Sequence, residues 1–373
     1  MVVTGVQPSA IDSAMMGLGW DLPDAVSVRH TIDPVAQVLT RVVSDATGPV
    51  ERAHIPLEHA CISCALREDV LPTLDRLARD GRWRTIVAGL PTGAEAHQLT
   101  GVLSQDSRLA KRLKVSALVA SLDGTRLVDD LLGDALLHEH GWHTGPDDDR
   151  GIGEVACSQV ELADVVLVSG AGETGSVTGT DSGTDSGIDS GIGREAVDLV
   201  AALARPDARL VLGAERLDAA ALVSGRHPYR AARRWSDPLE CAPVPPLLGS
   251  TAWRVELSSP RPFHPERMLE QVETLGAGPF RSRGVFWLPT RPREVQEWGG
   301  AGGQLSIGTR GEWGRQTPTT RLVITGLSPQ PTDLAGAFED LLLTHEEALL
   351  ERPRWRVLED GLEPWLGDIR DVA

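Results

Sequence analysis

Short, almost wholly apolar segments recur through the first 215 residues of the chain, and stretches with helical spacing separate several of them. A strand that is apolar on both faces is typical of a parallel sheet, because helices cover both sides of such a sheet. The segments that fit this description are residues 1–5, 25–29, 85–88, 115–122, 164–168 and 209–212. We therefore expect an α/β domain over residues 1–215, built on a parallel sheet flanked by helices.

The composition changes sharply after the last strands of this domain. Residues 169–193 are mostly Gly, Ser, Thr and Asp, with three tandem tetrapeptides ending in Asp-Ser-Gly, so we expect a disordered insert. Residues 216–250 are rich in Pro and Arg and are predicted to be a linker. Residues 251–350 show the order β-α-β-β-β-α, which predicts a smaller α+β domain, and residues 351–373 are predicted to be a tail.

The formal net charge of −17 limits the partners of this 373-residue chain. A field of that sign repels DNA and anionic membranes, so any RNA contact must come from a local basic patch. Four cysteines are too few for a disulfide framework, and neither a signal peptide nor a long apolar run is present, so we expect a reduced, cytoplasmic protein without a membrane partner. The only two lysines are Lys111 and Lys114, which excludes mechanisms that need a lysine elsewhere.

Cys61 and Cys64 stand in a Cys-x-x-Cys spacing directly before a helical pattern over residues 66–77. This spacing lets two sulfur atoms converge on one soft metal ion, or on each other. A loop that enters a helix also brings backbone N–H groups toward the sulfurs, which favours the thiolate. The sequence therefore indicates either a metal site or a thiol pair at this loop.

The best local basic patch lies between residues 226 and 235, where arginines stand beside Tyr229 and Trp235. Arginine together with aromatic side chains suits phosphate contact and base stacking in RNA. The alternative is a surface linker whose arginines pair with the acidic body. The candidate RNA-contacting or partner-contacting residues are Arg226, Arg230, Arg233 and Arg234.

The second domain resembles the C-terminal domain of the CobW family. The matching motifs, in family order, are Arg-Pro-Phe-His-Pro-Glu-Arg at 261–267, Arg-Ser-Arg-Gly-Val-Phe-Trp at 281–287, Ala-Gly-Gly at 301–303, Gly-Glu-Trp at 311–313, Arg-Leu-Val-Ile-Thr-Gly at 321–326 and Leu-Thr-His-Glu-Glu at 343–347. The first domain matches more loosely. Its motifs are His-Ala-Cys-Ile-Ser-Cys-Ala-Leu-Arg at 59–67, which looks like the family's Gly-Cys-x-Cys-Cys-x-Leu-Arg metal motif, and two later signatures at 116–123 and 159–164.

CobW proteins are P-loop GTPases, several of them implicated in handling zinc or cobalt, and this chain departs from them at the nucleotide motifs. Where the resemblance places the phosphate loop after Gly5, the residues Ala10, Ile11 and Asp12 stand in place of Gly, Lys and Thr. Only Gly5 and Ser13 keep residue types that could contact GTP or Mg²⁺. The guanine-reading Asn-Lys-x-Asp is also absent, as is the Glu expected after the 85–88 strand. We expect that ordinary GTP hydrolysis is lost; whether the chain is an enzyme stays open.

The metal motif departs as well, because Ser63 replaces the middle cysteine of the family's triplet. Zinc takes four protein ligands, or three and a water molecule, so two sulfurs do not complete a zinc site by themselves. His59 is a candidate third ligand and His54 a candidate fourth, while Cys157 is too distant in sequence to be placed. The resemblance thus implies a zinc site at Cys61, Cys64 and His59, with a residual or redox-active thiol pair as the alternative.

Within the family, the degenerate first loop, the Cys-x-Ser-Cys motif and the intact second domain are similar to those of actinobacterial proteins that recruit a hibernation factor to the ribosome under zinc starvation. This resemblance implies a zinc-responsive adaptor whose partners are the ribosome and that factor. Two alternatives are a CobW-type GTP-binding zinc metallochaperone and a zinc sensor or buffer that uses Cys61, Cys64 and His59.

Overall fold

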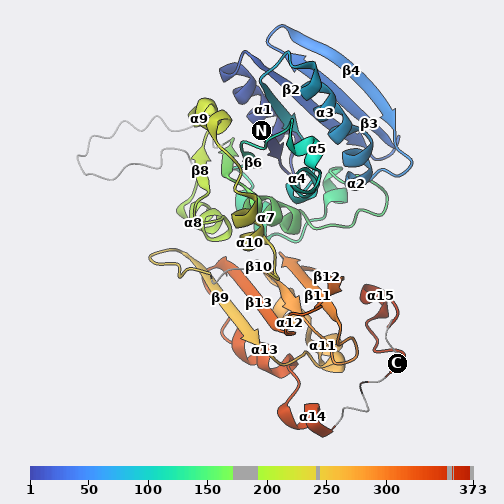
Figure 1. Ribbon diagram of the computed structural model, residues 1–373. Coiled ribbons are helices and arrows are strands. Elements are labelled where there is room, and N and C mark those ends of the chain that lie inside the picture. The colour runs from blue at the N-terminus through green and yellow to red at the C-terminus, as the bar shows by residue number, and fades with distance from the viewer. Residues whose placement is uncertain (171–191, 241–243, 351–354, 356, 370–373) are drawn as a thin grey trace, which may run out of the picture. The chain divides into compact units, whose positions relative to one another are not determined.

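The computed structural model describes residues 1–170, 192–240, 244–350, 355 and 357–369 (Figure 1). The chain divides into two compact units, which are described separately. The first comprises Met1–Asp130 with Ala135–Arg233, and the second Leu131–Asp134 with Arg234–Ala373. Most of the predicted insert at 169–193, including its tetrapeptides, lies outside the described residues, as does part of the predicted tail at 351–373.

The first unit is built on an eight-stranded sheet of order β4-β3-β2-β5-β1-β6-β7-β8. Six of its strands are parallel. They are β1 (Val2–Thr4), β2 (Ala25–Asp33), β5 (Thr85–Gly89), β6 (Leu118–Asp123), β7 (Val165–Ser169) and β8 (Arg209–Leu212). The predicted parallel sheet is thereby confirmed, and β1 lies in its interior between β5 and β6.

Two strands on one side of this sheet are not predicted from the sequence. β3 (Val38–Asp45) and β4 (Gly48–Pro56) extend the sheet as an antiparallel pair beyond β2. Most of their residues are exposed or half-buried, so they lack the continuous apolar run that identifies the inner strands. The cysteine loop follows β4 directly, so these two strands carry the loop into place.

Helices cover both faces of the sheet (Figure 1). On one face α1 packs Ile11, Ala14 and Leu18 against alternate strand residues such as Val3. On the other face α3 and α4 pack against the opposite set, which includes Val2. The helices up to residue 236 are α1 (Pro8–Asp21), α2 (Ile62–Ala65), α3 (Leu71–Asp80), α4 (Ala96–Gln105), α5 (Ser107–Ala110), α6 (Leu127–Leu132), α7 (Ile152–Leu162), α8 (Arg194–Leu203), α9 (Ala219–Ser224) and α10 (Tyr229–Ser236).

The stretch 216–250, expected to be a linker, contains α9 and α10. Leu222 of α9 and Ala232 of α10 are buried in the cores on the two faces of the first sheet. Between these helices His227 is buried, and its Nδ1 lies 2.9 Å from the Asp164 carboxylate. The boundary between the compact units falls after Arg233, well beyond residue 215.

The second unit has a five-stranded antiparallel sheet of order β12-β11-β10-β13-β9. Helix residues Met268, Phe338 and Leu341 pack with Phe263 and Trp298 in its core. Its elements are β9 (Ala252–Ser259), α11 (Pro265–Gln271), α12 (Glu273–Gly276), β10 (Phe280–Phe286), β11 (Glu294–Ala301), β12 (Gln304–Glu312), β13 (Thr320–Leu327), α13 (Leu334–Leu341), α14 (His345–Leu350) and α15 (Glu363–Leu366). The α+β class is confirmed, but sequence reasoning missed β11, whose glycines and polar residues hide its strand pattern.

A buried polar cluster lies beneath the antiparallel edge of the first unit. Arg41 donates hydrogen bonds to the Asp69 and Glu51 carboxylates, and at 3.0 Å to the Thr73 hydroxyl. His30 is fully buried 4.0 Å from Asp69, and neither ring nitrogen has a hydrogen-bond partner among the described residues. Burial lowers the pKa of His30 to about 4; Asp69 acts in the opposite direction, and Arg41 and Arg29 lower it further.

This arrangement predicts that His30 makes the protein less stable as the pH falls. The unfolded histidine titrates near its ordinary value of 6.5, so between about pH 6.5 and 4 the unfolded chain binds more protons than the folded one. Over this range His30 should lower the free energy of unfolding by up to about 3 kcal/mol as the pH falls. In His30→Leu this pH-dependent decrease should be absent. Urea unfolding at several pH values measures this decrease in unfolding free energy. The control is His345→Gln, which replaces an exposed histidine. An unchanged pH slope in His30→Leu would contradict the assignment.

Candidate metal centre

The two cysteines of the Cys-x-x-Cys motif lie together where the chain enters a helix, as the sequence predicts. Cys61 is the N-cap of α2, with extended backbone angles of φ −135° and ψ 155°. Its sulfur accepts a hydrogen bond from the backbone N–H of Cys64 over 3.3 Å. Cys61 is half-buried and Cys64 buried. An N-cap sulfur that receives a backbone N–H is a favourable place for negative charge.

The two sulfurs influence each other's protonation. A hydrogen bond between the side chains raises the pKa of Cys64, and burial and the Cys61 charge raise it further, whereas nearby Arg67 acts to lower it. Two thiolates this close repel each other, so both are deprotonated together most easily when a cation sits between them. The pair therefore has the chemistry of a metal-binding dithiol in which the ion displaces protons.

The helix that carries the motif is irregular. A π-helical turn, Leu66–Val70, joins α2 to α3, and the N–H of Leu71 bonds to the carbonyl of Leu66. Pro72 sits in the first turn of α3, where its missing N–H is tolerated. Asp69 lies within this turn and accepts a hydrogen bond from Arg41. π turns of this kind occur frequently at functional sites.

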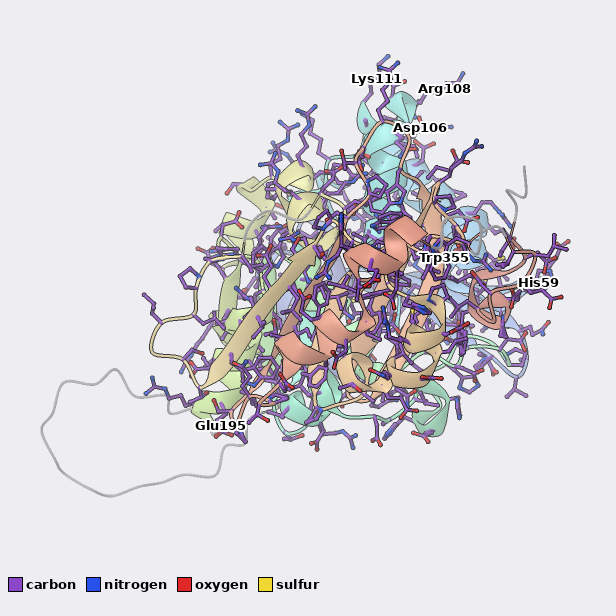
Figure 2. All side chains as sticks on the ribbon, turned by 90° about the horizontal axis from the view of Figure 1, so that it is seen from below. His59, Asp106, Arg108, Lys111, Glu195 and Trp355 are labelled. Atoms are coloured by element: carbon purple, nitrogen blue, oxygen red, sulfur yellow. The ribbon has the colours of Figure 1, made fainter. Side chains whose placement is uncertain are left out.

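A pocket of about 520 Å³ opens beside the cysteine loop. Its wall is formed by His59 and Cys61, by Glu95 and Gln98 near the start of α4, and by the loop 144–148. His59 is exposed at the surface, as Figure 2 shows. A side chain at Gly145 would overlap the carbonyl oxygen of Ala60, so only glycine lets the two loops touch.

Asp148 fixes the shape of the facing loop. Its carboxylate accepts a hydrogen bond from Arg150 Nε at 2.7 Å and from the Thr144 N–H and hydroxyl at 2.9 Å. Burial would raise the pKa of Asp148, but Arg150 and Thr144 outweigh it and lower the pKa to about 2. Asp148 is thus a loop-fixing group, whereas its neighbour Asp147 is exposed in the pocket wall.

The structure does not gather every residue considered as a ligand. His54 lies on β4, where its Nδ1 is 3.1 Å from the Thr40 hydroxyl, and Cys157 is buried in α7; neither lines the pocket. Across the part of the chain that the structure describes, no three His, Cys, Asp or Glu side chains are already placed to hold one ion. Of the two sulfurs, that of Cys61 lines the open pocket together with His59, whereas Cys64 is buried behind it and is absent from the pocket wall. The arrangement is not a closed structural zinc site, which would need four protein ligands.

The strand–helix junction after β1 has no room for a phosphate loop. Only Gly5, Val6 and Gln7 connect β1 to α1, which begins at Pro8, three residues before Ile11. Ile11 is fully buried, and a side chain on Gly5 would meet it at 2.9 Å. An early helical turn and a core isoleucine thus occupy the position where a nucleotide-binding loop would wrap phosphate.

The groups around this junction also lack the required charge. Gln7 donates a hydrogen bond to buried Asp130, and Asp12 forms an ion pair with Arg29 at 2.7 Å. Ser13, the candidate magnesium ligand, lies within α1, one turn beyond its start. Lys111 precedes β6 and therefore lies toward the amino ends of the parallel strands, whereas Gly5 lies at their carboxyl ends. Lys111 is exposed at the surface (Figure 2).

The predicted basic patch is only partly as expected. Its four arginines are all exposed: Arg226, Arg230, Arg233 and Arg234. The interpretation of Trp235 as a stacking platform was wrong, because this side chain is buried with the guanidinium groups of Arg254 and Arg283 over its ring. Tyr229 is half-buried.

Two family models match this chain. Residues 37–178 match the CobW/HypB/UreG nucleotide-binding domain, and residues 253–342 match the cobalamin synthesis protein cobW C-terminal domain. The matches fall on the two sheets described above and together span more than half of the chain. The chain belongs to the CobW family.

Similar proteins include three whose names mention zinc. Zinc chaperone Rv0106 from Mycobacterium tuberculosis is 26% identical over 92% of this chain and 88% of its own length. Zinc-regulated GTPase metalloprotein activator 1 from Dictyostelium discoideum is 22% identical over 72% of this chain and 56% of its own length. A third similar protein is described as the crystal structure of Zn(II)-bound YjiA GTPase from E. coli. Its sequence is 15% identical to this chain, the match covers 92% of this chain and 98% of the YjiA chain, and the TM-score is 0.34. Among the described residues of the present chain, no helix is long and apolar enough to cross a bilayer.

The geometry after β1 predicts that GTP does not bind tightly. We expect a fluorescent GTP analogue with Mg²⁺ to show no saturation below about 1 mM, a binding free energy weaker than about 4 kcal/mol. Anisotropy titration of metal-free and zinc-loaded protein measures this, with unlabelled GTP as competitor. Micromolar, competable binding would contradict the expectation and favour a GTP-dependent metallochaperone.

Proposed function

We propose that this CobW-family protein carries or senses zinc through Cys61 and Cys64, with His59 as a further ligand. The observation that supports this most directly is the N-cap sulfur of Cys61, which lines an open pocket and accepts a hydrogen bond from the Cys64 N–H. Soft sulfur donors select zinc over calcium or magnesium. The names of the relatives point to the same metal.

The incomplete ligand set suits a metal that is handed over. A structural zinc site encloses its ion with four protein ligands, whereas this one offers two sulfurs and an exposed histidine. The remaining positions are open to water or to a ligand from a partner. An ion held in this way can be exchanged without unfolding the loop.

Zinc binding should depend on both sulfurs of the motif. We expect one zinc ion per chain in competition with a chromophoric chelator, and loss of that binding in Cys61→Ser/Cys64→Ser. His59→Ala should weaken it about tenfold, because one ligand is replaced by water. Affinity should rise with pH, since each thiol must lose a proton.

The control for this experiment is Cys157→Ala, which removes a buried thiol that does not line the pocket. Its zinc stoichiometry should equal that of the unaltered protein. Undiminished zinc binding in the double cysteine variant would rule out the site and leave a residual thiol pair.

We further propose that the protein acts as a zinc-responsive adaptor that recruits a hibernation factor to the ribosome, without GTP turnover. Two features support this. The short β1–α1 junction, with buried Ile11 close to Gly5, supports a role that does not require nucleotide. In addition, Arg226, Arg230, Arg233 and Arg234 are exposed on a chain that is otherwise strongly acidic, which provides a local surface for RNA phosphates.

Ribosome association should depend on these four arginines. We expect cosedimentation with actinobacterial ribosomes in the presence of a hibernation factor. Changing all four arginines to glutamine should weaken it at least tenfold and flatten its salt dependence. The matched control changes four other exposed arginines: Arg52, Arg84, Arg108 and Arg315. Equal loss in both variants would show a general charge effect, and no loss in either would remove this patch from the proposal.

A further inference from the structure

Helix α1 carries apolar residues on both of its faces. Its inner face packs Ile11, Ala14 and Leu18 into the core of the first unit. On the outer face, Met16 and Trp20 are 71% and 87% exposed. They are four residues apart and therefore lie one above the other on the helix surface. A large aromatic side chain so exposed contributes nothing to the fold and is a usual component of protein contact surfaces.

A concave surface accompanies these side chains. A pocket of about 520 Å³ is lined by Met15, Met16, Trp20, Pro23, Ala25 and Val87, together with polar groups of β2 and the end of β3. It therefore lies between α1 and the neighbouring strands of the first unit. An apolar anchor from another molecule could enter it and pack against Trp20.

The acidic rim of this surface consists of Asp21 and Asp24, which stand next to Trp20 and Pro23 in the sequence, whereas the pocket itself also contains Arg29. Asp12, Asp21 and Asp24 are exposed around Trp20 in the sequence. Asp12 is paired with Arg29, but neither Asp21 nor Asp24 has an ion-pair partner among the described residues. Two unpaired carboxylates beside an apolar centre favour a partner whose apolar residues are flanked by lysine or arginine.

The same charges disfavour other occupants. A second copy of this chain would bring identical acidic rims together across a symmetric contact, in addition to a net charge of −17 on each copy. RNA and anionic lipid are repelled for the same reason. A basic amphipathic protein segment satisfies both the apolar centre and the acidic rim.

We propose that the outer face of α1 at Met16, Trp20 and Asp21, together with Pro23 and Asp24 just after the helix, is a docking surface for a basic amphipathic helix of a partner protein. This surface has a pocket with no lining residue in common with the pocket beside the cysteine loop. It uses the helix that in a P-loop protein begins at the bound phosphate.

The probe for this surface is a fluorescein-labelled synthetic peptide of leucine and lysine at helical spacing, followed by fluorescence anisotropy. We expect saturable binding at low salt, at least tenfold weaker in Met16→Ala/Trp20→Ala. The control double variant, Val35→Ala/Leu248→Ala, removes side chains that are 92% and 88% exposed elsewhere and should bind as the unaltered protein does. Because all four residues are exposed, urea unfolding should show every variant folded.

A charge variant provides the second arm of the experiment. Asp21→Asn/Asp24→Asn should weaken the peptide about threefold to tenfold and reduce the salt dependence, whereas Asp80→Asn/Glu346→Gln should not. A matched peptide with glutamate in place of lysine should not bind. Equal binding by the Met16/Trp20 variant and the unaltered protein would overturn the proposal, as would a dimer in solution that Trp20→Ala dissociates.

Discussion

The first unit depends on the burial of β1 between two helical layers. Val2 and Val3 are adjacent in sequence, yet they belong to separate hydrophobic cores on opposite faces of the sheet. Burial of apolar surface on both sides stabilises the strand and fixes α1 directly behind it. Ile11 packs into one of these cores, and it stands at the position where the sequence resemblance places the lysine of the phosphate loop. A side chain buried in this way contributes to the stability of the fold.

The fold could be predicted from the sequence where the burial pattern is simple. The inner strands β6 and β7 are apolar almost throughout and were identified from that alone. β4 was missed because exposed polar residues alternate along an edge strand, as they also do in many loops. The prolines near α9 and α10 indicated a linker, but they stand beside the helices and leave Leu222 and Ala232 free to enter the cores.

The candidate site was predictable only where its residues are close in sequence. Cys61 and Cys64 share one loop and helix start, so their spacing places both sulfurs together. The loop 144–148 stands some 80 residues further along the chain and reaches the cysteines only through the tertiary fold, so no local pattern could identify it. For Trp235 the residue type predicts an exposed aromatic side chain that stacks on RNA bases. In the structure this side chain is buried, with the guanidinium groups of Arg254 and Arg283 over its ring.

The π turn at Leu66–Val70 has a consequence for the history of this loop. A π turn holds one residue more than the α-helical turn it replaces, so it arises and disappears by a change of one residue. Deleting that residue would rotate the cysteines by about 100° relative to α3. Cys61 could then no longer face its pocket while Asp69 faces Arg41. The number of residues between Cys64 and Asp69 therefore couples the orientation of the cysteine loop to the buried ion pair.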